Sequence, residues 1–149
     1  MQATFETTLE RSNLGAIPTA TGGKAQRLTG RVLSGIAIAF LSFDAVIKLI
    51  EIEPVRKGTV ELGYPVEIAF TLGVVLLASV IIHLIPRTAV LGALLLTGYL
   101  GGAVATHVRV ANPLFSHTLF PIYVAVFIWA GLVLRDQRVR AAFGFGARA

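Results

Sequence analysis

The sequence contains no cysteine, and few of its residues carry a charge. Without cysteine, the chain has no thiol catalysis, no disulfide bonds and no thiolate metal ligands. Charged residues make up 14% of the 149 residues and hydrophobic residues 55%, whereas about a quarter of a soluble domain is charged. Too few polar residues remain to cover the surface of a water-soluble domain. We therefore exclude a soluble enzyme, a disordered protein and a nucleic-acid-binding module.

The hydrophobic residues are concentrated in four segments that follow a polar stretch at residues 1–28. These segments are Val32–Ile50, Tyr64–Ile85, Thr88–Thr106 and Leu119–Leu134. A helix needs about 20 apolar residues to cross the hydrocarbon core of a bilayer, with a range of about 17–25. The first three segments satisfy this length, and the fourth does so if Ser116–Thr118 extend it. Because the third segment has no polar face at helical spacing, we interpret all four as transmembrane helices.

These segments predict an all-α fold, a membrane four-helix antiparallel bundle with a mobile N-terminal tail. We expect a flexible tail over residues 1–28, helix onset near Thr29 and Gly30, the bundle over 29–141 and a second tail over 142–149. Pro86 should end the second helix, and Thr88 should cap the third. Residues 51–63 and 107–118 are expected to form loops. Because the N-terminal stretch has no apolar run before a small-residue cleavage site, we expect no signal peptide.

Lysine and arginine are unevenly distributed over the two sides of this bundle. With four crossings, both termini and the turn at Arg87 share one side, which carries nine basic residues. The opposite side carries three, which are Arg56, Lys57 and Arg109. Cytoplasmic loops of membrane proteins are enriched in basic residues, so we expect a multi-pass protein with both termini in the cytoplasm.

The third segment is rich in small residues at helical spacing. One stripe contains Ala93, Thr97, Gly101 and Ala105, and a second contains Gly98, Gly102 and Thr106. Small residues four apart let helix backbones approach closely within a bilayer. The stripes therefore indicate either a central packing helix or a thin wall beside a ligand channel, and we favour the packing helix.

Asp44 and Lys48 are charged residues inside the first apolar segment. They are four residues apart, so they share one helix face, and Glu51 continues that stripe. Asp44 lies about 10 Å deep at the helical rise, too deep for its short side chain to reach the surface. We expect it to face the bundle interior, paired with Lys48 or with a residue of another helix. The pair is either a proton or ligand site or an ion pair that only orients the helix.

Other polar residues are predicted to lie at the same, outer end of the bundle. Together with Asp44 and Lys48, the candidate ligand-binding residues are Glu67, Tyr99, His107, Arg109 and His117. Tyr123 could reach the same layer. Topology places these residues at similar depth, so they either form one pocket or are unrelated interfacial residues. Because no tight metal-ligand spacing is present, we expect no metal or haem site, and we expect His83 to be an interfacial residue at the opposite end.

Several stretches of the sequence resemble the DoxX-like family. They are SFDAVIKL at Ser42–Leu49, LGYP at Leu62–Pro65, the run at Ile85–His107, RVANPLFSHTLFPIY at Arg109–Tyr123 and LRDQR at Leu134–Arg138. The resemblance covers about Gly30–Ala141 and implies a small four-helix protein of the bacterial inner membrane. Relatives that give the family its name are subunits associated with quinone-linked sulfur or terminal oxidation, and others accompany redox enzymes. No catalytic residue carries over by this resemblance.

These observations favour an accessory subunit that is linked to a membrane oxidoreductase and binds a quinone. Lys48, His107 or Arg109 would donate to a quinone oxygen, and Asp44 or Glu67 would exchange protons. The sequence has no motif for a covalently bound cofactor, a flavin or an iron–sulfur cluster, so electrons would come from a partner enzyme. The alternatives are a small-molecule transporter and an assembly factor without catalytic activity. We expect the lipid bilayer, a redox enzyme subunit and a second copy of the chain as partners, and no nucleic acid.

Overall fold

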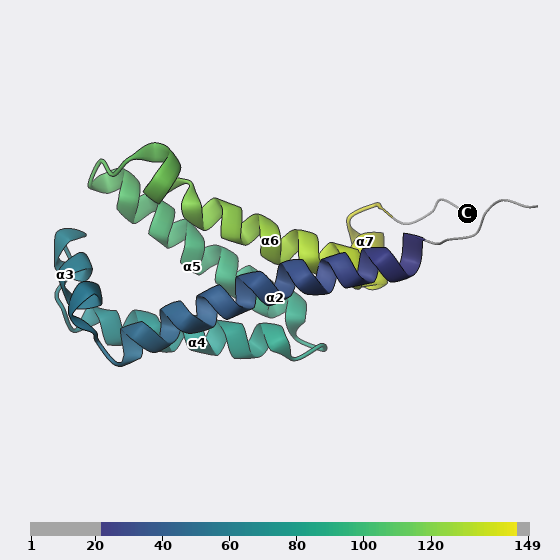
Figure 1. Cartoon of the computed structure of the whole chain (residues 1–149), viewed down its shortest axis with the longest axis horizontal. Coiled ribbons are helices and arrows are strands. Elements are labelled where there is room, and N and C mark those ends of the chain that lie inside the picture. Colours follow the sequence, from purple (N-terminus) through teal and green to yellow (C-terminus); the bar gives the residue numbers. More distant parts are fainter. Residues whose placement is uncertain (1–21, 146–149) are drawn as a thin grey trace, which may run out of the picture.

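The computed structural model describes residues 22–145, which form helices and connecting turns without a β-strand. Its four long helices are α2 (Gly22–Leu49), α4 (Ile68–Leu84), α5 (Ala89–Arg109) and α6 (Phe120–Arg135). Three short elements are α3 (Glu53–Glu61), the π-helical turn η1 (Leu114–Thr118) and α7 (Gln137–Ala142). The predicted all-α antiparallel bundle is therefore confirmed, as Figure 1 shows.

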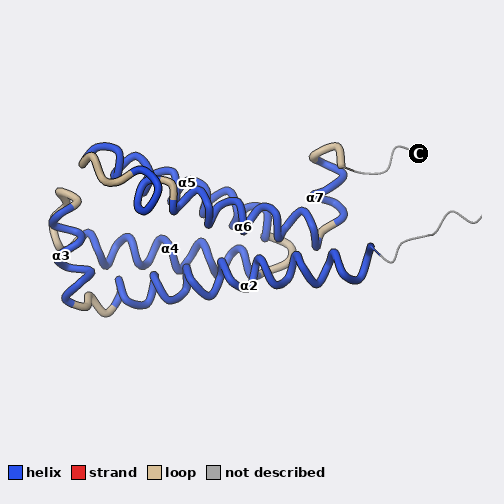
Figure 2. The backbone as a smooth tube through the Cα atoms, turned by 45° about the horizontal axis from the view of Figure 1, so that its top comes forward, coloured by secondary structure: helices blue, strands red, loops and turns tan. Residues whose placement is uncertain are grey.

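Each long helix packs against two others. Helices α4 and α6 each contact both α2 and α5, so the four form a closed ring in the order α2, α4, α5, α6. Figure 2 shows that the pair α2/α4 and the pair α5/α6 lie close together where α2 begins and diverge towards α3. We call the end where α2 begins and α6 ends the terminal end, and the opposite one the α3 end. The α3 end corresponds to the predicted outer end of the bundle.

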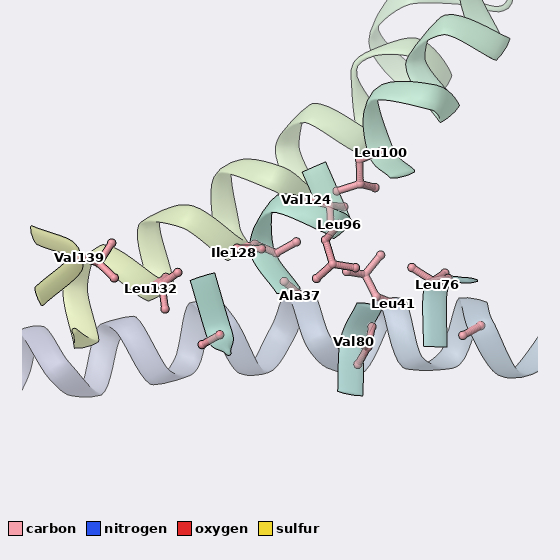
Figure 3. Packing of buried hydrophobic residues seen from close by; sticks show 13 residues of the cluster. Ala37, Leu41, Leu76, Val80, Leu96, Leu100, Val124, Ile128, Leu132 and Val139 are labelled. Atoms are coloured by element: carbon pink, nitrogen blue, oxygen red, sulfur yellow. The ribbon is translucent and has the colours of Figure 1, made fainter. Parts of the chain in front are cut away.

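The core contains aliphatic side chains, and the outer faces of the helices are also apolar. Leu41, Leu76, Leu96 and Ile128 are buried where all four long helices meet (Figure 3). Large apolar side chains point outward from each long helix, among them Phe43, Val75, Leu91 and Val126. A bundle in water would cover its outer faces with polar residues. Lipid is the solvent that these faces match.

Glycine allows close helix contact at the terminal end. A Cβ atom on Gly92 of α5 would collide with the backbone of His83 on α4. A Cβ atom on Gly30 of α2 would lie 2.8 Å from the Gly131 carbonyl oxygen on α6. His83 lies in the last turn of α4, at the end of the bundle where we expected it, but its side chain is fully buried in this contact and does not face the membrane interface.

Two helix lengths differ from those we expected. Helix α2 begins at Gly22, ahead of the predicted onset at Thr29 and Gly30, and the predicted tail before Gly22 lies outside the described residues. Helix α4 has 17 residues, fewer than the predicted segment Tyr64–Ile85, because residues 62–67 form turns before it. At the helical rise it spans about 25 Å, near the lower limit for crossing a bilayer.

Within residues 22–145, three helices are long and apolar enough to cross a membrane. They are Gly23–Leu49, Ala89–Arg109 and Leu114–Arg135. The last of these includes η1. Ser116–Thr118 therefore extend the fourth predicted segment, which gives it the length needed to cross a bilayer.

The connections between the long helices contain more structure than we predicted. Residues 53–61, expected as part of a loop, form α3, and residues 137–142 form α7. The Asp136 side chain caps α7 by accepting from the backbone N–H of Arg138 at 2.9 Å. Pro86 follows the end of α4 as predicted, but the Thr88 hydroxyl does not cap α5. It donates to the Ile82 carbonyl oxygen at 2.8 Å and so satisfies the end of α4 instead.

Candidate functional site

A cavity of about 590 Å³ lies at the α3 end. The two helix pairs diverge at this end (Figure 2). Residues of all four long helices line it, together with Thr59 of α3 and the loop residues Leu62 and Tyr64. Its walls are mainly apolar and include Phe40, Leu41, Ile68, Leu72, Phe120 and Val124. A cavity of this size and composition is typical of sites for small lipophilic ligands, which occupy about 300–1,000 Å³.

An ion pair supplies the charge on the cavity wall. The Lys48 ammonium group contacts the Asp44 carboxylate one helical turn away, and the side chains are 20% and 24% exposed. Both residues line the cavity. Gly73 of α4 packs behind the pair, because a Cβ there would lie 3.0 Å from the Lys48 Cβ. Helix α4 therefore covers the back of this α2 turn and leaves the charged groups on the cavity side.

His107 lines the same cavity from the end of α5. The Asn112 amide donates to its Nδ1 at 2.8 Å, an arrangement that places the imidazole proton on Nε2. Among the described residues, Nε2 has no hydrogen-bond partner, so its N–H is available to a ligand oxygen. The His117 ring lies edge-on to His107 with centroids 5.9 Å apart, but His117 is exposed and bonds Ser116.

Contacts beside the cavity hold the loop after α3 to the end of α5. The Tyr64 hydroxyl lies 2.9 Å from the Thr106 hydroxyl, and the Arg109 guanidinium lies over the Tyr64 ring. Arg109 also donates to the Leu62 carbonyl oxygen at 2.5 Å. Gly63, with a φ of 75°, allows the tight turn that presents this carbonyl. These contacts connect the two diverging helix pairs at the α3 end.

The structure brings together four of the seven residues that we predicted as ligand contacts. Asp44, Lys48, Tyr99 and His107 line the cavity. Arg109 does not line the cavity, but its guanidinium contacts the wall residues Leu62 and Tyr64.

The other two predicted contacts, Glu67 and His117, are exposed and do not belong to the cavity wall. Glu67 precedes the first turn of α4 and forms no ion pair within residues 22–145. Tyr123, on α6, is also exposed and outside the wall. The candidate site is thus narrower than the polar layer that topology suggested.

Our preferred interpretation of α5 as a central packing helix is confirmed only for the half of α5 at the terminal end. Gly92 and Ala93 are buried against neighbouring helices, as that interpretation requires. A Cβ atom on Gly98, Gly101 or Gly102 would meet no atom within 4 Å. Gly98 and Gly102 line the cavity. The α3 half of α5 is therefore a thin wall beside a cavity, the interpretation that we ranked second.

Sequence analysis missed Thr59, Tyr64 and Thr106 as residues of the site. Thr59 falls in the predicted loop 51–63 and Tyr64 begins the predicted segment Tyr64–Ile85, so nothing indicated that either side chain lines a cavity. The signal that could have identified Tyr64 is the turn residue Gly63 beside an aromatic side chain at the start of an apolar segment. Within residues 22–145, no group of three or more His, Asp or Glu side chains has the geometry of a metal site.

The family of the chain follows from a comparison with protein-family models. The model described as the DoxX-like family matches residues 32–131, which include most of α2, all of α4 and α5 and much of α6. No curated protein and no solved structure matches the chain. The chain therefore belongs to the DoxX-like family, and its apolar helices make it an integral membrane protein.

Proposed function

We propose that this member of the DoxX-like family binds a lipophilic quinone in the cavity at its α3 end, as an accessory component of a membrane redox system. The observation that supports the proposal is the composition of the cavity. One ion pair, two tyrosines, two threonines and one histidine lie on walls that are otherwise apolar. An isoprenoid tail matches the apolar walls, and a quinone ring needs a few hydrogen-bond donors for its oxygens.

Three side chains on the wall have a donor that no described residue occupies and that could bond a quinone oxygen. The Lys48 ammonium group has three N–H bonds, and its ion pair with Asp44 occupies one of them. The Tyr99 hydroxyl and the His107 Nε2–H have no partner among the described residues. Asp44 supplies the carboxyl group of the wall, so proton exchange with a bound quinone would use Asp44 rather than Glu67.

The cavity can be filled without changing the charge or polarity of the protein. Gly102→Leu should place a side chain in the cavity, and Gly101→Leu should place it outside, since both glycines have open space around them. With the full chain in detergent micelles and decylubiquinone as the probe, we expect Gly102→Leu to weaken binding at least about tenfold. Gly101→Leu should stay within about twofold of the unmodified protein.

A second comparison tests recognition of the quinone ring. Lys48→Met should weaken binding about tenfold, because a hydrogen bond from a charged donor contributes about 1.5–3 kcal/mol. Lys57→Met, on the exposed face of α3, removes the same charge away from the cavity and should leave binding unchanged. Decylbenzene, which lacks the two carbonyl oxygens, should bind more weakly than decylubiquinone. Equal binding of these two compounds, or equal effects of the two glycine variants, would overturn the proposal.

A further inference from the structure

The terminal end of the bundle has a second cavity, of about 430 Å³, with a composition unlike that of the first. It lies between the start of α2, the turn from α4 to α5, and the junction of α6 with α7. Four arginines line it, which are Arg27, Arg31, Arg135 and Arg138. One carboxylate, that of Asp136, lies on its wall.

The positive charge of this cavity is not neutralised by the residues that the structure describes. The Asp136 carboxylate accepts from the Arg138 backbone N–H, where it caps α7. Within residues 22–145, none of the four arginines forms an ion pair with a carboxylate. Four guanidinium groups around one cavity repel each other, and an anion placed between them would relieve that repulsion.

A buried histidine orients one of the four arginines. His83 is fully buried, and its Nδ1 lies 2.8 Å from the Ala89 carbonyl oxygen, so Nδ1 carries the proton and donates it. Nε2 is then an acceptor, and Arg135 Nη2 donates to it at 3.3 Å. A neutral histidine therefore holds the Arg135 guanidinium at the cavity and leaves most of its N–H groups to other acceptors.

The position of the cavity limits the kind of anion that can reach it. Arg135 is the last residue of α6, and Arg31 directly precedes the apolar part of α2 that begins at Val32. Both arginines therefore lie at the level where lipid headgroups meet water. The guanidinium fork of arginine matches phosphate oxygens in a bidentate geometry. Leu84, Pro86 and Leu132 form an apolar part of the same wall.

From this geometry we propose that the cavity at the terminal end binds a phosphate group, with Arg135 and Arg31 as its principal contacts. Two sources supply that chemistry, the headgroup of an anionic phospholipid and a soluble phosphate. A basic residue that only sets the orientation of a membrane helix needs no buried partner. The contact from His83 to Arg135 is therefore what separates this cavity from an ordinary basic rim.

The test uses the full chain in neutral detergent and compares three variants that lose one positive charge each. Arg135→Gln and Arg31→Gln change the cavity, and Arg87→Gln removes an exposed arginine at the same end that does not line it. Native mass spectrometry would measure retention of phosphatidylglycerol against phosphatidylcholine, and thermal unfolding would be followed with and without inorganic phosphate.

We expect each cavity variant to bind the phosphate source about fivefold more weakly, and Arg87→Gln to stay within about twofold. Selective retention of phosphatidylglycerol with this variant pattern identifies a lipid headgroup. Stabilisation by inorganic phosphate with the same pattern identifies a soluble phosphate. Equal losses in all three variants, or no preference for either anion, would overturn the proposal. Arg31 is exposed, so Arg31→Gln gives a reading even if Arg135→Gln fails to fold.

Discussion

Gly92 on α5 lies against the backbone of His83, whereas Gly102, further along the same helix, lies beside open space. The first glycine brings α4 and α5 together at the terminal end, and the second leaves room for a cavity at the α3 end. The polar groups differ in the same way. The His83 imidazole is buried and bonded on both nitrogens, while His107 keeps one nitrogen towards a cavity. Close packing thus holds α4 and α5 together at the terminal end and leaves a mainly apolar cavity between the helix pairs at the α3 end.

The largest expected effect tests whether the two glycines differ. Gly92→Ala should lower the free energy of unfolding by about 3 kcal/mol, because the added methyl group meets backbone atoms that move only if α4 and α5 separate. Gly102→Ala should be neutral or stabilising by up to about 1 kcal/mol, since alanine favours helix and nothing lies in its way. Unfolding in mixed detergent micelles, followed by circular dichroism, measures both. Equal losses would mean that both ends are packed alike.

A smaller effect is expected from the two histidines. His83→Leu should cost about 2 kcal/mol of unfolding free energy, because the buried Ala89 carbonyl loses its donor and Arg135 loses its acceptor. His107→Leu should cost less than about 1 kcal/mol, because Asn112 can turn to water. The same unfolding measurement applies. A larger loss at His107 than at His83 would contradict the contrast between the ends.

The next effect compares two acid–lysine pairs with the same spacing. Asp44 and Lys48 are mostly buried, whereas Glu53 and Lys57 on α3 are 68% and 70% exposed with 3.3 Å between their charged atoms. A double-mutant cycle with amide replacements should give a coupling of about 1–2 kcal/mol for the first pair. The exposed pair should give less than about 0.5 kcal/mol. Similar couplings would show that water reaches the Asp44 carboxylate as freely as it reaches α3.

The smallest effect concerns the contacts between the loop after α3 and the end of α5. Arg109→Leu removes the contacts to the Leu62 carbonyl and the Tyr64 ring that tie the α3 loop to α5. We expect amide hydrogen exchange in residues 53–64 to rise about fivefold, in line with a hydrogen bond of roughly 1 kcal/mol. Exchange in α7, at the other end, should not change. An unchanged rate in residues 53–64 would show that α3 is held by other contacts.

The membrane fold could be predicted because its signal lies in the composition and in the lengths of the apolar segments. The Asp44–Lys48 pair was accessible for the same reason, since both residues lie on one helix and their spacing fixes their neighbourhood. We predicted the correct end of the bundle for Glu67, but in the structure this residue does not line the cavity. Depth along the bundle follows from topology, whereas rotation about each helix axis is set by packing against its neighbours.

Other parts of the site required the three-dimensional arrangement. Small residues recur along the whole of α5 in the sequence. Gly92 and Gly102 nevertheless have opposite surroundings, because α4 approaches one end of α5 and diverges from the other (Figure 2). The pairing of His83 with Arg135 joins residues from α4 and α6, so no local spacing could reveal it. The position of the loop after α3 depends likewise on Arg109, a residue far along the chain.

By itself, the sequence determined that this chain is a membrane bundle with ionisable residues near one end, because hydrophobicity and helical spacing are local properties. Only the tertiary structure decided which of those residues share a cavity, and that arginines gather around a buried histidine at the other end. The reason is that the crossing of the helix pairs sets the distances between them. Side chains at equal depth meet where the pairs converge and stand apart where they diverge.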